Sequence, residues 1–145
     1  MEITSGRQLE RAVAKLGRAF GLEVYQQHKS GQRIWGRAQH IDIMLRDPEQ
    51  RLRLGIECKY QGVPGTAEEK IPGTIQDMDA WAMRGVVVIH GGGFSENFPA
   101  FARASGKVIW FDELPDFLID YFDLPMHYAQ QAEMILNGAA GAQTD

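Results

Sequence analysis

Two alternating runs, HIDIMLR at residues 40–46 and RLRLGIECKY at residues 51–60, decide the fold of this chain. Successive side chains of a β-strand point to opposite faces, so each run predicts a strand with one apolar face. The intervening DPEQ at residues 47–50 is typical of a turn. We therefore expect the two strands to pair side by side in one antiparallel arrangement.

The alternation also sorts the polar side chains onto one face. The residues expected to point inward are Ile41, Ile43, Leu45, Leu52, Leu54, Ile56, Cys58 and Tyr60. Asp42 then lies on the opposite face of the first strand, across from Glu57 and Lys59, which are about 6–7 Å apart. Gly55 shares that face, and we expect it to leave space for a ligand.

Outward from this pair, periodicity predicts the remaining elements. They are a helix opened by a Ser5/Gln8 capping box and ending near Phe20, a short strand at 22–26, a basic loop at 29–37, a helix at 74–84, a strand at 86–89, a helix near 96–104, a strand at 107–110 and helices at 114–122 and 126–136. This order predicts an α/β fold: a mixed sheet of four to five strands flanked by helices, with the core order α-β-β-β-α-β. We expect a single domain over residues 1–137 and a flexible tail over 138–145.

Composition narrows the class of protein. A chain of 145 residues with 44% apolar residues is long and apolar enough to bury one core. One cysteine, Cys58, excludes an internal disulfide framework and a cysteine-based zinc cluster. The longest strongly apolar run, Val86 to Ile89, is far too short to cross a membrane, and the first residues lack the features of a signal peptide. We expect a cytoplasmic protein with no membrane association.

The net charge of −4 hides a gradient along the chain. Residues 1–60 carry eleven Lys/Arg against seven Asp/Glu, whereas residues 61–145 carry four against twelve. Binding to a polyanion depends on local surface charge, so we expect a polyanion to bind the basic half of the chain. The candidate contacts are Arg7, Arg11 and Lys15 on one face of the first helix, Lys29, Arg33 and Arg37 in the basic loop, and His40 and Lys70. A solvated helix face is an equally simple interpretation of the first group.

The carboxylates of Asp42 and Glu57 suggest a metal site. Two carboxylates brought together repel, and one stays protonated unless a cation neutralises them. Mg²⁺ suits such a pair, and the Cys58 carbonyl between Glu57 and Lys59 offers a further oxygen ligand. Lys59 supplies a positive charge that can hold a water or stabilise a transition state. An exposed strand with alternating charges is the simpler alternative for Glu-x-Lys alone.

Asp42, separated by fourteen residues from Glu57-Cys58-Lys59 within the α-β-β-β-α-β order, resembles the PD-(D/E)xK nuclease superfamily, which has the restriction-endonuclease-like fold. The resemblance implies that Asp42 and Glu57 bind one or two Mg²⁺ ions, with Mn²⁺ as a substitute, and that Lys59 assists the attacking water. The chain departs from the family pattern at Ile41, where the motif has proline.

Two further residues follow from the same resemblance. Glu10 matches the first-helix acid of the Holliday-junction-resolvase and lambda-exonuclease-like branches, where that acid helps to hold metal or water. Gln61 matches a polar position that several branches place beside the site. The homing, restriction-type and resolvase branches all stay open, and the setting implied is a prokaryotic or phage-encoded protein.

The leading hypothesis is a Mg²⁺-dependent DNA endonuclease that acts as a homodimer or higher homo-oligomer, because a chain this short would most simply cut two strands as a two-fold pair. The residues from Leu114 to Leu136 are a candidate interface. The alternatives are a nuclease-fold module that binds DNA or assembles without cutting, and an unrelated α/β interaction protein.

Overall fold

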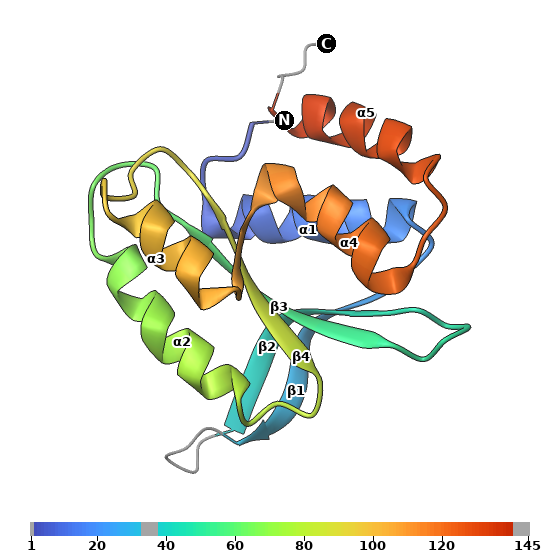
Figure 1. The fold of residues 1–145 in the computed structure, drawn as a ribbon, viewed down its shortest axis with the longest axis horizontal. Coiled ribbons are helices and arrows are strands. Elements are labelled where there is room, and N and C mark those ends of the chain that lie inside the picture. Colours follow the sequence, from blue (N-terminus) through green and yellow to red (C-terminus); the bar gives the residue numbers. More distant parts are fainter. Residues whose placement is uncertain (1, 33–37, 141–145) are drawn as a thin grey trace.

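The computed structural model describes residues 2–32 and 38–140 (Figure 1). In chain order the elements are α1 (Gly6–Ala19), β1 (Glu23–Gln32), β2 (Ala38–Arg46), β3 (Arg53–Tyr60), the 3₁₀ helix η1 (Ala67–Lys70), α2 (Ile71–Met78), β4 (Arg84–His90), α3 (Phe98–Ser105), β5 (Val108–Trp110), the 3₁₀ helix η2 (Phe111–Glu113), α4 (Leu114–Phe122) and α5 (Tyr128–Ala140). This sequence of elements confirms the predicted α-β-β-β-α-β core.

The described strands form one mixed sheet in the order β1-β2-β3-β4-β5. The first three strands are antiparallel neighbours, and β4 and β5 continue the sheet parallel to β3. Parallel neighbours need a crossover between them, and α2 and α3 provide these connections. The predicted fold class, a mixed sheet of four to five strands flanked by helices, is therefore confirmed.

Helices cover both faces of the sheet (Figure 1). α1, α4 and α5 lie on one face and enclose the larger core, which includes Leu16, Ile56 and Phe122. α2 and α3 lie on the other face and enclose a smaller core, which includes Ile71 and Phe98. Since α4 points its apolar side into the larger core, much of the surface that we considered for dimerisation is already buried within the chain.

The two cores explain the pattern of the inner strands. In β4, Val86 and Val88 belong to the larger core, whereas Val87 and Ile89 belong to the smaller one. A strand that is covered on both faces has a continuous run of apolar residues, and β4 has such a run from Val86 to Ile89.

The alternation predicted for β2 breaks at one residue. Ile43 and Leu45 lie in the larger core as expected, but Ile41 lies in the smaller core on the opposite face. The prediction that all three share a face was therefore wrong. The change of face occurs at Asp42, where the backbone pairing of β2 with its neighbours is also interrupted.

Gly55 does not leave space for a ligand, as we had expected. Trp81 packs over it so closely that a Cβ at Gly55 would lie 2.6 Å from Trp81 Cζ3, and a Cβ at Gly85 would lie 2.7 Å from the same ring. The two glycines are adjacent in the β3–β4 register. Their missing side chains make room for an indole ring that closes the smaller core.

Three predicted boundaries move. β1 extends to Gln32 and takes in part of the expected basic loop, because an edge strand tolerates polar residues that hide its pattern. α2 begins at Ile71, since Pro72 fits the first turn of a helix, and it ends at Met78 instead of near Arg84. α5 runs to Ala140 and so includes residues 138–140, which we assigned to the tail. No helix in the described part of the chain is long and apolar enough to span a membrane.

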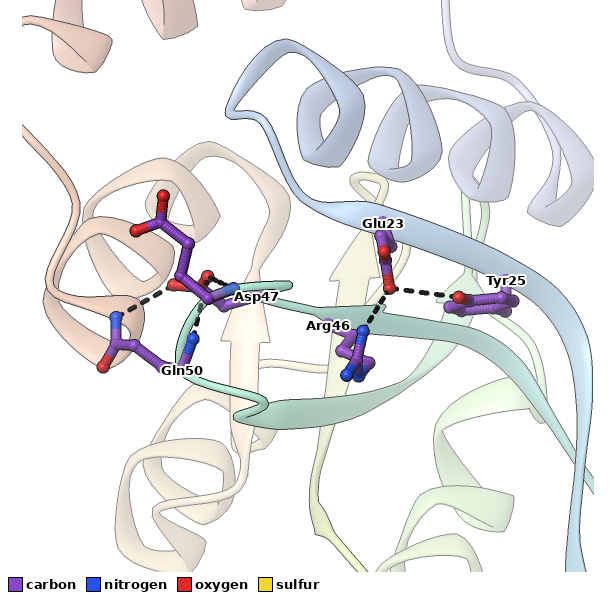
Figure 2. A network of polar contacts seen from close by, with 6 residues as sticks. Glu23, Tyr25, Arg46, Asp47 and Gln50 are labelled. Carbon is purple, nitrogen blue, oxygen red and sulfur yellow. Dashed lines mark hydrogen bonds and ion pairs between the residues drawn. The ribbon is translucent and has the colours of Figure 1, made fainter.

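The turn between β2 and β3 is held by Asp47 (Figure 2). Its Oδ1 accepts from the Glu49 backbone N–H at 2.9 Å, and its Oδ2 accepts from Gln50 Nε2 at 2.9 Å. Gln50 Nε2 also donates to the Phe122 carbonyl oxygen at the end of α4. The turn therefore sets the register of β2 against β3, which continues from Ile43 opposite Ile56 towards the pair Asp42 and Glu57.

A second polar contact links β1 to β2 beside this turn. Arg46 Nη1 donates to Glu23 Oε1 at 2.7 Å, and the Tyr25 hydroxyl donates to the same oxygen at 3.1 Å (Figure 2). Glu23 and Arg46 are also register partners. This pair supports the edge strand whose far half reaches the candidate site.

Candidate active site

Asp42 and Glu57 lie where the β2–β3 ladder ends. The last backbone pair is Ile43 with Ile56, and beyond it side chains bridge the two strands. The backbone N–H of Asp42 donates to Glu57 Oε2 at 2.9 Å, and the backbone N–H of Cys58 donates to Asp42 Oδ2 at 2.9 Å. Each carboxylate is thus held in place by a main-chain N–H, and the two acids lie side by side.

Burial and mutual repulsion make this pair electrostatically unfavourable without a cation. Glu57 is only 9% exposed. Burial, followed by the negative charge of Asp42, raises the pKa of Glu57 to about 7. The hydrogen bond from the Asp42 backbone N–H and the charge of Lys59 oppose this rise. A carboxyl pair of this kind gains most from a bound divalent ion.

Glu10 reaches the same cluster from α1. Burial raises its pKa, and the charge of Asp42 raises it further. Gln27 Nε2 donates to Glu10 Oε1 at 3.4 Å, and both this bond and the charges of Arg7 and Lys59 lower the pKa. The acid predicted from the first helix is therefore close enough to Asp42 and Lys59 to interact with both.

Lys59 lies two residues after Glu57 in β3 and is partly exposed. Its positive charge acts on Glu57, Glu10 and Cys58. The Cys58 side chain lies in the larger core, and burial raises the pKa of its thiol well above the usual value. A buried neutral thiol is a poor nucleophile, so the chemistry of this segment belongs to the acids and the lysine.

Gln61 lies just beyond the strand and is 5% exposed. Its Nε2 donates to Glu68 Oε1 at 2.9 Å and to the Gly93 carbonyl oxygen at 2.8 Å, and its Oε1 accepts from the Glu68 backbone N–H at 2.9 Å. Both N–H groups of the amide have acceptors. We therefore expect Gln61 to hold the loops after β3 and β4 together beside the site instead of touching substrate.

The donor set fits a hard divalent cation. Within residues 2–32 and 38–140, no group of three or more His, Cys, Asp or Glu side chains is arranged to hold a metal. The pair Asp42 and Glu57 nonetheless offers carboxylate oxygens, which Mg²⁺ prefers, and Mg²⁺ commonly keeps several waters and only one or two carboxylates. The Cys58 carbonyl stays a predicted third protein ligand.

The predicted DNA contacts fall into three groups. Arg7, Arg11 and Lys15 are exposed on α1, and Lys70 is exposed at the end of η1. His40 is exposed on β2 and pairs through its backbone with Lys29. Arg33 and Arg37 lie outside the described residues.

One residue beside the site gave no signal in the sequence. Gln27 lies in β1 with a left-handed backbone, φ 53°, and contacts Glu10. Glutamine has no preference for this conformation, and a polar strand residue has an ordinary appearance in the sequence. Only the three-dimensional arrangement identifies it.

Comparison with known proteins identifies the family of this chain. A family model described as a PD-(D/E)XK nuclease superfamily domain matches residues 3–108. No curated protein matches. Among solved structures, the protein of unknown function AF1548 is similar with a TM-score of 0.50 and 18% identity, covering 71% of this chain and 56% of that chain. VC1899 from Vibrio cholerae has a TM-score of 0.46 and 14% identity, covering 92% of this chain and 33% of that chain.

This chain therefore spans just over half the length of AF1548, and at that identity the likeness concerns the fold alone. The family model shows more than the fold, because it matches most of the chain. The matched range includes Glu10, Asp42, Glu57 and Lys59. On this evidence the chain belongs to the PD-(D/E)XK nuclease superfamily.

Proposed function

We propose that this protein is a Mg²⁺-dependent endodeoxyribonuclease. The observation that carries the proposal is a pair of main-chain bonds: the Asp42 N–H donates to the Glu57 carboxylate and the Cys58 N–H donates to the Asp42 carboxylate. Lys59 lies on the same strand as Glu57, and Glu10 is in electrostatic reach. Membership of a nuclease superfamily supports hydrolysis of a phosphodiester bond as the reaction class.

In this proposal Asp42 and Glu57 hold the metal, with the Cys58 carbonyl as a further ligand and Mn²⁺ as a substitute for Mg²⁺. When bound, such an ion would neutralise the two carboxylates and offset the negative charge that develops on the phosphate. Lys59 holds and orients a water for in-line attack on phosphorus. Glu10 helps to hold that water. The new P–O bond forms as the bond to the 3′ oxygen breaks, which leaves a 5′-phosphate and a 3′-hydroxyl.

The exposed side chains of Arg7, Arg11 and Lys15 would contact the DNA backbone from α1. Contacts to phosphate release counterions, so binding should weaken steeply with salt. A two-fold dimer would allow two such sites to cut both strands of a duplex.

A plasmid nicking assay tests the proposal. The wild-type chain should nick supercoiled DNA in Mg²⁺ or Mn²⁺ and not in EDTA. Lys59→Ala should lower the rate by about 100-fold or more, because the water loses its positioning charge. Lys107→Ala is the matched control, since Lys107 makes only an exposed 3.5 Å contact with Asp79.

Cleavage that persists in Lys59→Ala would contradict the role given to this lysine. Binding without cleavage in any divalent metal would support instead the non-cutting DNA-binding module. A chain that neither binds DNA at low salt nor binds a divalent metal would contradict both.

A further inference from the structure

Gln27 has an unusual backbone conformation within β1, beside the candidate site. Its φ of 53° lies in the left-handed region, which is rare for a residue with a side chain. The other described non-glycine residues with positive φ are Arg51, in the β2–β3 turn, and Asp123, at the C-terminal end of α4, where this conformation is common. Gln27 instead lies inside a strand, beside the candidate site.

The backbone pairing of β1 with β2 skips this residue. Gln26 pairs with Ile43 and His28 pairs with Ile41, so Gln27 faces Asp42, yet no pairing joins these two. The backbone N–H of Asp42 donates to Glu57 Oε2 instead. The left-handed residue Gln27 therefore lies opposite Asp42, the residue at which the regular pairing of β2 is interrupted and whose N–H bonds to the second acid.

The side chain of Gln27 makes a second link. Its Nε2 donates to Glu10 Oε1 at 3.4 Å, although the residue is exposed and burial does not demand a partner. One residue thus contacts the acid from α1 through its amide and faces the acid from β2 through its backbone.

We propose that Gln27 is a positioning residue that orients Asp42 through its left-handed backbone and Glu10 through its amide. This inference rests on the proposed nuclease function. Strained backbone conformations tend to persist where the surrounding structure needs them, and functional sites are common among such places.

Variants of the full chain can separate the two roles. Gln27→Gly keeps the left-handed backbone and removes the amide, whereas Gln27→Val opposes that backbone through its branched Cβ. Gln26→Gly and Gln26→Val are matched controls, because Gln26 is equally exposed and pairs normally. Nicking kinetics at several Mg²⁺ concentrations would be measured alongside the amide signal of Asp42 in NMR spectra of the metal-free protein.

Gln27→Val should lower kcat by about 10- to 100-fold with little change in KM for DNA, as expected when catalytic groups are displaced by a small distance. It should also raise the Mg²⁺ concentration needed for half-maximal rate and shift the Asp42 amide signal. Gln27→Gly should lower kcat less and leave that signal in place. At position 26 neither substitution should change kcat or the signal.

Wild-type kcat in both Gln27 variants would overturn the proposal, and so would an unshifted Asp42 signal in Gln27→Val. If Gln27→Val does not fold, Gln27→Gly still decides the role of the amide, because wild-type kcat in that variant would contradict it. If the wild-type chain does not cut DNA at all, the nuclease proposal fails, while the Asp42 signal still decides whether Gln27 orients this acid.

Discussion

At the scale of single residues, the candidate site depends on a carboxyl that is buried against another. The pKa of Glu57 is raised to about 7 in the folded chain, whereas its ordinary value is 4.5. Between these two values the unfolded chain releases a proton that the folded chain keeps. The folded state therefore loses stability as the pH rises from about 4.5 to 7, by up to about 3 kcal/mol, and stays at that lower level above pH 7.

Glu57→Gln should remove this penalty. In EDTA at pH 8 the variant should be more stable than the wild type by about 1–3 kcal/mol, and the difference should shrink towards zero near pH 4.5. The glutamine Oε1 can still accept the hydrogen bond from Asp42. Urea unfolding at a series of pH values measures the effect.

Glu23→Gln supplies the opposite sign as a control, since the hydrogen bonds from Arg46 and Tyr25 lower the pKa of Glu23. That variant should lose stability relative to wild type at neutral pH and not at low pH. A Glu57→Gln variant that is destabilised equally at every pH would contradict the raised pKa of Glu57, which burial and then the charge of Asp42 produce.

The acids and Lys59 were predictable because the period of a strand is two, so spacing alone places Glu57 and Lys59 on one face. The main-chain bonds from Asp42 to Glu57 and from Cys58 to Asp42 were not predictable, because they form where the β2–β3 ladder stops. Gln27 was also not predictable, since neither its left-handed backbone nor its contact with Glu10, seventeen residues away, has a signal in a single sequence.

At the scale of elements, the strands with a strong apolar period were predicted over nearly their full length, whereas only the first half of the edge strand β1 was predicted. β3 and β4 carry the pattern of buried strands, and their predicted extents agree with the structure within a few residues. β1 has few apolar residues after Val24, so its length follows from pairing with β2 and not from its own composition. Gly55 was misread for a similar reason, because Trp81 arrives from a segment far along the chain.

This packing predicts coupling between Gly55 and Trp81. Gly55→Ala should destabilise the chain by about 1–3 kcal/mol, because the added methyl group overlaps the indole ring. Combined with Trp81→Leu, the same substitution should cost much less free energy of unfolding than it does alone, which a double-mutant cycle in urea would measure.

Gly73→Ala is the control. No atom lies within 4 Å of its added Cβ, and alanine in α2 should stabilise the chain by about 0.5–1 kcal/mol. Strict additivity of the two core changes would contradict the contact.

At the scale of the whole molecule, the sequence predicted two layers of helices around a mixed sheet, because a strand that is apolar throughout must be covered on both sides. It did not assign each helix to a face. That assignment places α1 on the face of the larger core. Because Glu10 of α1 lies within electrostatic reach of Asp42, the helix that carries the exposed basic residues adjoins the proposed reaction site.

If this arrangement binds DNA, the salt dependence of binding should report it. Arg11→Gln with Lys15→Gln removes two exposed charges of α1 and leaves Arg7, which acts on Glu10, in place. In EDTA, the slope of log K against log salt should fall by about 2, as expected for two lost phosphate contacts. Arg103→Gln with Lys107→Gln removes the same charge from α3 and the segment after it. Neither residue is among the charges that act on Glu10 or Glu57, so this pair should leave the slope nearly unchanged. Fluorescence anisotropy with a labelled duplex measures both pairs. Equal changes in the two pairs would mean that net charge alone, and not the face of α1, governs binding.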